Sequence, residues 1–166
     1  MNVSSGQLRI ALGILGAVVL GLLLNRFVVT DKKRIERTVQ EMAEAAAKGD
    51  IDLLFSHISA DYRDDSLSRT GLKSLATTYM DRYESTDPRI QWITVIVEGS
   101  MAHVQLGVSG GNARGGYPAR YGTSEWSAEF RKESDRVWRM TSLKPARMYG
   151  REVSSWRDVT QRFEGR

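Results

Sequence analysis

The sequence contains no cysteine and only two histidines, His57 and His103, among its 166 residues. Without cysteine, the chain has no disulfide scaffold, no thiol nucleophile, no thiolate zinc site and no cysteine-ligated iron–sulfur cluster. Two histidines are too few for a multi-histidine metal centre. We therefore expect neither a metal ion nor a cofactor.

A strong excess of charge of one sign is also lacking. The formal net charge is +4, and two of the positive charges, Arg9 and Arg26, precede the first acidic residue at position 31. The rest of the chain is therefore close to neutral. Nucleic-acid binding needs a concentrated positive surface. We expect no nucleic-acid partner.

One long apolar run occupies the N-terminal region. Residues 10–24 carry no polar side chain, and the segment 10–29 as a helix reaches about 30 Å, the thickness of a bilayer core. Asn25, Arg26 and Phe27 follow in place of the small residues of a signal-peptide cleavage site. We therefore predict a tail and membrane anchor over residues 1–30, with a cleaved signal peptide as the alternative.

The flanking charges predict the orientation of this single-pass anchor. Basic residues are more numerous after the run than before it, which favours a cytoplasmic location for the following domain. A periplasmic or extracellular location stays open, because Lys32 and Lys33 also fit the wet face of the first helix. Gly13, Ala17 and Gly21 are spaced four apart, which is compatible with a homodimer; small residues are also common in any membrane helix.

Three helices are predicted after the anchor. Asp31 is placed to cap a helix over residues 32–48, whose apolar side chains recur at steps of three and four. Gly49 is suited to end that helix, and Asp50 to cap a short one over residues 51–55. Ser68 or Thr70 begins a third helix, and Pro88 closes the region.

Strands fill the second half of the chain. Alternating and β-branched residues predict strands over 90–97, 101–108, 121–132 and 137–143, with a short fifth over 58–62. The glycine-rich stretch 109–120 is predicted to be a flexible loop. Residues 31–145 then form one α+β domain, and residues 146–166 a basic tail with a short helix that docks through Val153, Trp156, Val159 and Phe163.

Four segments carry a resemblance to a known family. They are Ile35-x6-Met42 ending in Ala47-Lys-Gly-Asp-Ile-Asp-Leu-Leu54, then Ile58-Ser-Ala-Asp-Tyr62, the helix start Gly71–Leu75, and Val137-Trp-Arg-Met-Thr-Ser-Leu143. In this order they resemble the NTF2-like superfamily, also called SnoaL-like or cystatin-like α+β barrels. The resemblance implies a cone of three helices packed on a curved antiparallel sheet around a pocket. It implies no single activity, because this fold hosts isomerases, dehydratases, hydrolases, binding modules and secretion scaffolds.

Acid–base residues are sparse where such a pocket would need them. No predicted strand places an isolated carboxylate among apolar residues on its core face. If the protein is an enzyme, a His57–Asp61 dyad at the pocket mouth and His103 as a base on the sheet are the catalytic candidates. The alternative places all three at helix ends, turns and a solvated strand face.

Two further sets of residues are binding candidates. Arginines among the glycines of the predicted loop, Arg114 and Arg120, suit an anion. Aromatic residues suit an apolar pocket, with ordinary core packing as the alternative. The aromatic candidates are Tyr62, Tyr79, Tyr83, Trp92, Trp126 and Trp138.

These observations together favour a membrane-anchored, non-catalytic domain that binds a small apolar ligand or a partner protein. The alternatives are a SnoaL-like or isomerase-type enzyme acting on a small apolar substrate, and a scaffold of an envelope complex.

Overall fold

The computed structural model describes residues 30–64, 67–82, 85–114, 117–153, 155–156 and 158, with backbone alone for 85–86, 112–114 and 117–121. None of the helices in these ranges is both long and apolar enough to cross a bilayer. The predicted membrane segment, residues 10–29, lies outside the described residues, so the anchor stays a prediction.

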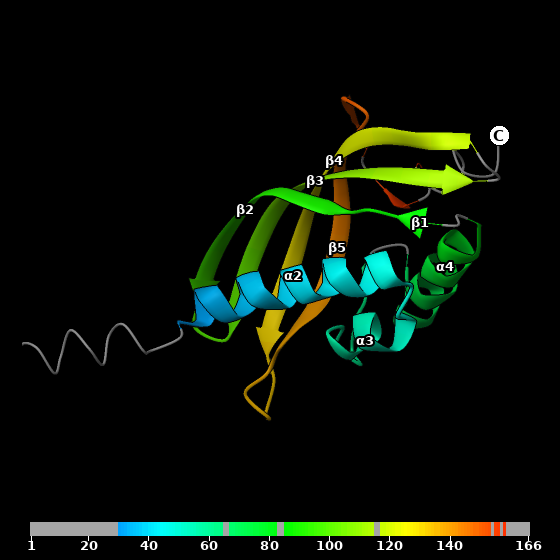
Figure 1. Ribbon diagram of the computed structural model, residues 1–166. Helices are drawn as coiled ribbons and strands as arrows, with labels where there is room; N and C mark the ends of the chain where they lie inside the picture. The colour runs from blue at the N-terminus through cyan, green and yellow to red at the C-terminus, as the bar shows by residue number, and fades with distance from the viewer. Residues whose placement is uncertain are drawn as a thin grey trace, which may run out of the picture. The chain divides into compact units, whose positions relative to one another are not determined.

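Helices precede strands along the chain (Figure 1). The helices are α2 (Asp31–Lys48), α3 (Ile51–Ser56) and α4 (Arg69–Arg82), and the strands are β1 (Ser85–Thr86), β2 (Arg89–Glu98), β3 (Met101–Arg114), β4 (Tyr117–Lys132), β5 (Trp138–Met148) and β6 (Arg151–Glu152). This order confirms the predicted α+β class.

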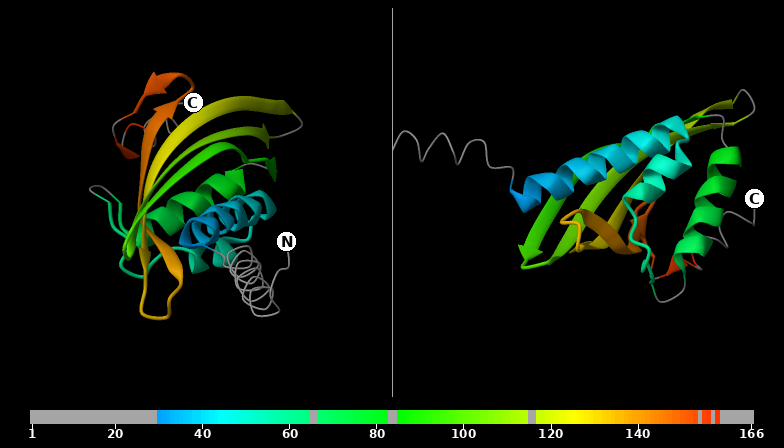
Figure 2. Two further views of the ribbon diagram at one scale, coloured as in Figure 1. Left: turned by 90° about the vertical axis from the view of Figure 1, so that its left-hand side faces the viewer. Right: turned by 90° about the horizontal axis from the view of Figure 1, so that it is seen from below.

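A single antiparallel sheet forms one wall of the domain. Its strand order is β1-β3-β4-β5-β6, and β2 pairs with β3 beside β1. The long strands curve, and the helices lie on the concave side of the curve, with α2 running beneath β2 and β3 (Figure 2). The sheet therefore wraps around the helices as the predicted cone requires.

The predicted helix signals act as expected. Gly49 takes the left-handed φ of +71° that ends α2, where a side chain would be strained. The Asp50 carboxylate accepts a hydrogen bond from the Leu53 amide at 2.9 Å and so caps α3. At α4 the Ser68 hydroxyl accepts from the Gly71 amide at 3.2 Å. Local sequence thus marks where α2 ends and where α3 and α4 begin, whereas Asp31, predicted to cap α2, is the first residue of that helix.

The core lies between the helices and the concave face. Ile35 of α2, with Val104 and Phe130 of the sheet, is among its most buried side chains. Alternation along the strands places their neighbours on the opposite face. The core cluster comprises Ile35, Val39, Phe55, Ile58, Tyr62, Leu72, Val95, Ala102, Val104, Ala128, Phe130, Trp138, Met140, Val153 and Trp156.

The glycine-rich stretch is sheet where a loop was predicted. Strands β3 and β4 continue through it, pairing Gly110 with Gly122 and Gly111 with Tyr121. A Cβ on Gly110 would lie 3.3 Å from the Asp87 carbonyl oxygen, and the Asp87 amide donates to the Gly111 oxygen at 3.2 Å. Glycine here permits close approach of a neighbouring chain segment within an ordinary ladder.

The last strand also departs from prediction. Strand β5 continues past Leu143 to Met148, turns back through β6, and Val153 and Trp156 are buried against the core. The proposed division at residues 30/31 and 145/146 stays a prediction, although β5 crosses the second boundary. The predicted strand 58–62 is a single parallel bridge from Ile58 to Met140 along the β5 edge.

Candidate functional site

An apolar cavity of about 340 Å³ lies between the helices and the sheet. Met42 and Ala46 of α2 border it from one side, and Val108 and Trp126 of the sheet from the other. Aromatic rings and thioethers dominate its lining. These are Phe55, Tyr79, Trp126, Tyr149 and Trp156, with Met42, Met80, Met140 and Met148. The volume lies within the range of small-molecule sites.

The cavity lining lacks charge. None of the described residues around it is Asp, Glu, His, Lys or Arg. Its two indole donors are already engaged: Trp126 Nε1 donates to the Ser124 hydroxyl at 2.8 Å, and Trp156 Nε1 donates to the Leu143 carbonyl at 2.8 Å. The two rings are tilted by 43° at 5.5 Å between centroids. Hydrogen bonds thus fix the rings, which present apolar surface to the cavity.

The structure does not form the His57–Asp61 dyad. His57 ends α3, and its Nε2 atom lies 3.6 Å from Oε2 of Glu41 on α2. Asp61 is exposed and pairs with Arg131 at 2.7 Å. Neither residue lines the cavity. The prediction was wrong because Asp61 points to the strand that passes beside it, a partner remote in sequence.

His103 lies on the outer face of the sheet. It is exposed and stands between Ile96 on β2 and Glu129 on β4, while its chain neighbours Ala102 and Val104 are buried. Strand alternation therefore directs His103 away from the cavity. All three catalytic candidates lie outside the cavity.

Comparison with known proteins supports this architecture. No protein-family profile matches the sequence, and no curated protein matches it either. Solved structures do match, among them a proposed dehydratase from the NTF2-like family of Streptomyces avermitilis, with 16% identity over 68% of this chain and 93% of that one, at a TM-score of 0.61. The fold is NTF2-like.

Two further structures have the same NTF2-like fold. A proposed aromatic ring hydroxylase from Novosphingobium aromaticivorans is 17% identical, over 78% of this chain and 96% of that one, at a TM-score of 0.62. An NTF2-like superfamily protein from Salmonella enterica serovar Typhimurium is 14% identical, over 69% and 88%, at a TM-score of 0.58. At these identities the likeness concerns the fold alone.

The aromatic candidates occupy different parts of the NTF2-like cone. Tyr79 and Trp126 line the cavity, whereas Tyr62 and Trp138 are buried elsewhere in the core. Trp92 is 44% exposed on the outer face, which contradicts its assignment to the pocket. Tyr83 lies outside the described residues.

Sequence reasoning missed three lining residues near the C-terminus. Met148, Tyr149 and Trp156 lie beyond the predicted end of the cone at residue 145. The apolar spacing of Val153 and Trp156 predicted that the tail packs on the domain. It did not indicate that the tail contributes to the cavity wall.

Tyr62 is a buried phenol close to the cavity wall. Its hydroxyl lies near Leu143 and Trp156 but has no hydrogen bond of good geometry with any described residue. Burial raises the pKa of Tyr62 well above its ordinary value of 10.0, and the Asp64 carboxylate adds to that rise. The phenol is therefore neutral at physiological pH and contributes an apolar ring to the core.

The structure corrects the loop on which the anion-binding prediction depended, but it does not test whether the two arginines bind an anion. Arg114 ends β3, and Arg120 pairs with Asn112 inside the β3–β4 ladder, so neither belongs to a glycine loop. Their side chains lie outside what the structure describes.

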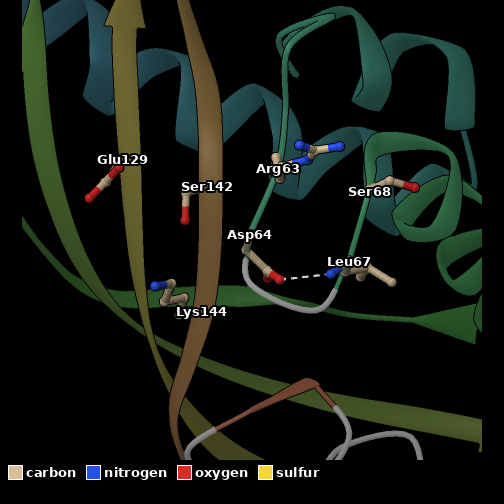
Figure 3. A pocket seen from close by; sticks show the side chains of 7 residues that line it. All are labelled: Arg63, Asp64, Leu67, Ser68, Glu129, Ser142 and Lys144. Atoms are coloured by element: carbon tan, nitrogen blue, oxygen red, sulfur yellow. Dashed lines mark hydrogen bonds between the residues drawn. The ribbon is translucent and has the colours of Figure 1, made fainter.

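A second hollow opens on the outer side of β4 and β5. It encloses about 670 Å³ and is lined by Arg63, Asp64, Leu67, Ser68, Glu129, Ser142 and Lys144 (Figure 3). The Leu67 amide donates to the Asp64 carboxylate at 2.9 Å, while Arg63, Glu129 and Lys144 are exposed. Because its charged side chains of both signs are already hydrated, we consider this hollow a weaker ligand site than the apolar cavity.

Proposed function

We propose that the chain is a membrane-anchored NTF2-like domain whose cavity binds a small, uncharged, largely apolar ligand without transforming it. The observation that carries the proposal is the lining, which combines aromatic rings and thioethers with no charged side chain among the described residues. Burial of apolar ligand surface contributes about 25 cal/mol per Å². A charged ligand would lose its water there without gaining a partner.

The same lining supports binding without chemistry. Proton transfer requires an acid or base within hydrogen-bond reach of the reacting atom. The described cavity residues offer hydroxyls such as Ser124 and Tyr79, while His57, Asp61 and His103 lie elsewhere.

Two adjacent alanines of α2 provide a matched test. Ala46 lines the cavity and Ala47 is exposed, so phenylalanine at each position adds the same side chain inside and outside. We expect 2-naphthol, an uncharged planar probe, to bind the wild-type full-length chain in isothermal titration calorimetry. Ala46→Phe should weaken that binding by at least about tenfold, or ~1.4 kcal/mol, and Ala47→Phe should leave it unchanged.

The control for folding is the thermal midpoint of each variant by circular dichroism. Wild-type protein that releases no heat with 2-naphthol and related neutral aromatics would contradict the proposal, as would equal binding by the two folded variants.

Catalysis is the second candidate, favoured by the names of structures that share the fold. One is described as a proposed dehydratase, one as a proposed aromatic ring hydroxylase and another as a proposed scytalone dehydratase. The two candidates differ in what is recovered after long incubation: a binding protein returns the ligand unchanged, and an enzyme returns a product detectable by mass spectrometry.

The anchor belongs to the proposal because residues 10–24 form an uninterrupted apolar run. We infer a single-pass anchor with the cone in the cytoplasm, from the basic residues that follow the run. Retention of the full chain in membranes after alkaline carbonate washing supports the anchor. Cytoplasmic activity of a reporter fused to the C-terminus supports the orientation, and release into the wash contradicts the anchor.

A further inference from the structure

Tyr149 connects the cavity to solvent. Its side chain lines the cavity, yet the residue is 64% exposed, the most exposed of the large apolar and aromatic residues described. A residue that is both lining and exposed must lie at the mouth. Tyr79 and Met80 of α4 border the same cavity from the helical side. The phenol therefore stands between bulk water and the inner rings, Trp126 and Trp156.

The ring rests directly on Gly122 of β4. A Cβ built on Gly122 would lie 2.2 Å from Cε1 of the Tyr149 ring, so any side chain at Gly122 would displace the ring. The Tyr149 amide also donates to the Thr123 carbonyl at 2.9 Å. A hydrogen bond thus holds the backbone of the turn to β4, whereas the Tyr149 ring meets Gly122 through ring carbons.

The backbone at Tyr149 is in an unfavourable conformation for its residue type. Tyr149 and Gly150 form the two-residue turn between β5 and β6, with φ of +52° and +75°. Turns with two left-handed residues favour Asn-Gly, Asp-Gly or Gly-Gly, because a bulky side chain crowds the backbone there. A tyrosine in this place costs stability that asparagine would not, which points to a use for the ring.

A second pair in the protein has the same packing without the cavity. The Trp92 ring covers Gly107 on the outer face, where a Cβ would lie 2.2 Å from Nε1 of the ring. Trp92 and Gly107 are opposite residues of paired strands, and Trp92 does not line the cavity. In this pair an aromatic ring covers a glycine without lying at the mouth of the cavity.

We propose that Tyr149 is a movable cover of the cavity, which swings off Gly122 to admit the ligand and returns to enclose it. The inference rests on the proposed ligand binding for its role, but the cover itself is a property of the unliganded protein. Rotation of one side chain about a pinned backbone is sufficient, and no movement of the sheet is required. Ring positions over and off Gly122 then set the rates of ligand exchange.

The first test needs no ligand. Acrylamide, a small neutral quencher, should reach Trp126 and Trp156 through the mouth. Trp92→Phe removes the exposed indole, so the emission of the full-length chain then comes from these two rings and from Trp138, which is 2% exposed and does not line the cavity. In this background we expect Tyr149→Asn and Gly122→Ala to raise the quenching constant about threefold, because both take the ring off the mouth. Asparagine suits the turn, so Tyr149→Asn should keep the fold.

Gly107→Ala in the same background is a control for a methyl group added on the outer face of the sheet, away from the cavity, and it should leave the quenching constant unchanged. Equal quenching in the parent, Tyr149→Asn and Gly122→Ala would overturn the cover. An equal rise with Gly107→Ala would overturn it too, since the effect would then be general loosening.

The second test measures exchange of 2-naphthol by stopped-flow fluorescence. Tyr149→Asn and Gly122→Ala should raise the association and dissociation rate constants together, by about tenfold, with a smaller change in Kd. Tyr149→Phe keeps the ring and should retain the wild-type rates. Unchanged rates in a wild type that binds would overturn the cover and leave the binding function standing. Failure of the wild type to bind, with the quenching result intact, would overturn the ligand class and support the cover.

Discussion

The two faces of the sheet differ in how their side chains find partners. On the concave face of β4, Trp126, Ala128 and Phe130 pack against helices and the cavity. On the convex face of the same strand, Glu125 pairs with Arg147 at 3.3 Å and Arg131 with Asp61 at 2.7 Å. Exposed ion pairs contribute little to stability, whereas buried rings contribute much. The comparison teaches that folding depends mainly on the concave face, which is also the face that borders the cavity.

The two aromatic–glycine pairs sharpen the same contrast. Trp92 on Gly107 and Tyr149 on Gly122 make the same close contact. Only the second pair borders the cavity, so only it acquires a role in exchange. The two pairs thus differ in where they lie in the fold and not in the kind of contact that they make.

The largest expected loss of stability comes from Phe130, whose neighbour Glu129 on the opposite face serves as the control. Phe130 is 1% exposed, so Phe130→Ala should cost about 3–5 kcal/mol of unfolding free energy through lost burial and the space left behind. Glu129→Ala, one residue away on the exposed face, should change stability by no more than about 0.5 kcal/mol. Urea unfolding followed by tryptophan fluorescence measures both. Similar costs at the two positions would break the comparison.

A smaller effect is expected from the buried phenol at alkaline pH. Because burial raises the folded-state pKa of Tyr62 above the ordinary 10.0, its stabilising contribution is complete below pH 10 and is lost as the pH rises toward the folded-state value. Tyr62→Phe should therefore lose less stability than wild type between neutral pH and pH 11. Urea titrations across this range test it, and parallel decline of the two proteins would contradict the assignment.

The smallest expected change in stability comes from Asp135, a residue on the solvent-exposed side. Arg139 and the Val137 amide bind the Asp135 carboxylate at 2.8 and 3.0 Å, and hold the pKa of Asp135 below its ordinary 3.8. Its contribution is present above the ordinary pKa and is lost as the pH falls through the lowered one. Asp135→Asn should lower stability slightly at pH 7, where the contribution is present, and flatten the acid limb of the stability curve. A steeper acid limb in the variant would refute this sign.

Much of the architecture could be predicted because its signals are local. Asp50 and Ser68 mark helix starts through bonds to residues three positions ahead, and Gly49 marks an end through its own φ. Alternation along 121–132 separates Phe130 from Glu129 correctly. The glycine stretch 109–120 misled because Gly110 serves a close contact with Asp87, which is distant in sequence.

The candidate site was harder to predict because it is assembled from all parts of the domain. Tyr79 and Trp126 were found by residue type, but Trp92 was placed in the pocket on the same ground and lies on the opposite face. His57 and Asp61 are four residues apart, yet each meets a different partner from another element.

The sequence by itself determined the α+β order, the helix ends and the faces of the strands, since these follow from the chemistry of neighbouring residues. Only the tertiary structure decided which face encloses the cavity, which aromatics line it, and that the turn at Tyr149 lies over Gly122. These features depend on sheet curvature and on contacts between residues far apart in the chain, so they cannot be inferred from any one residue and its neighbours in sequence.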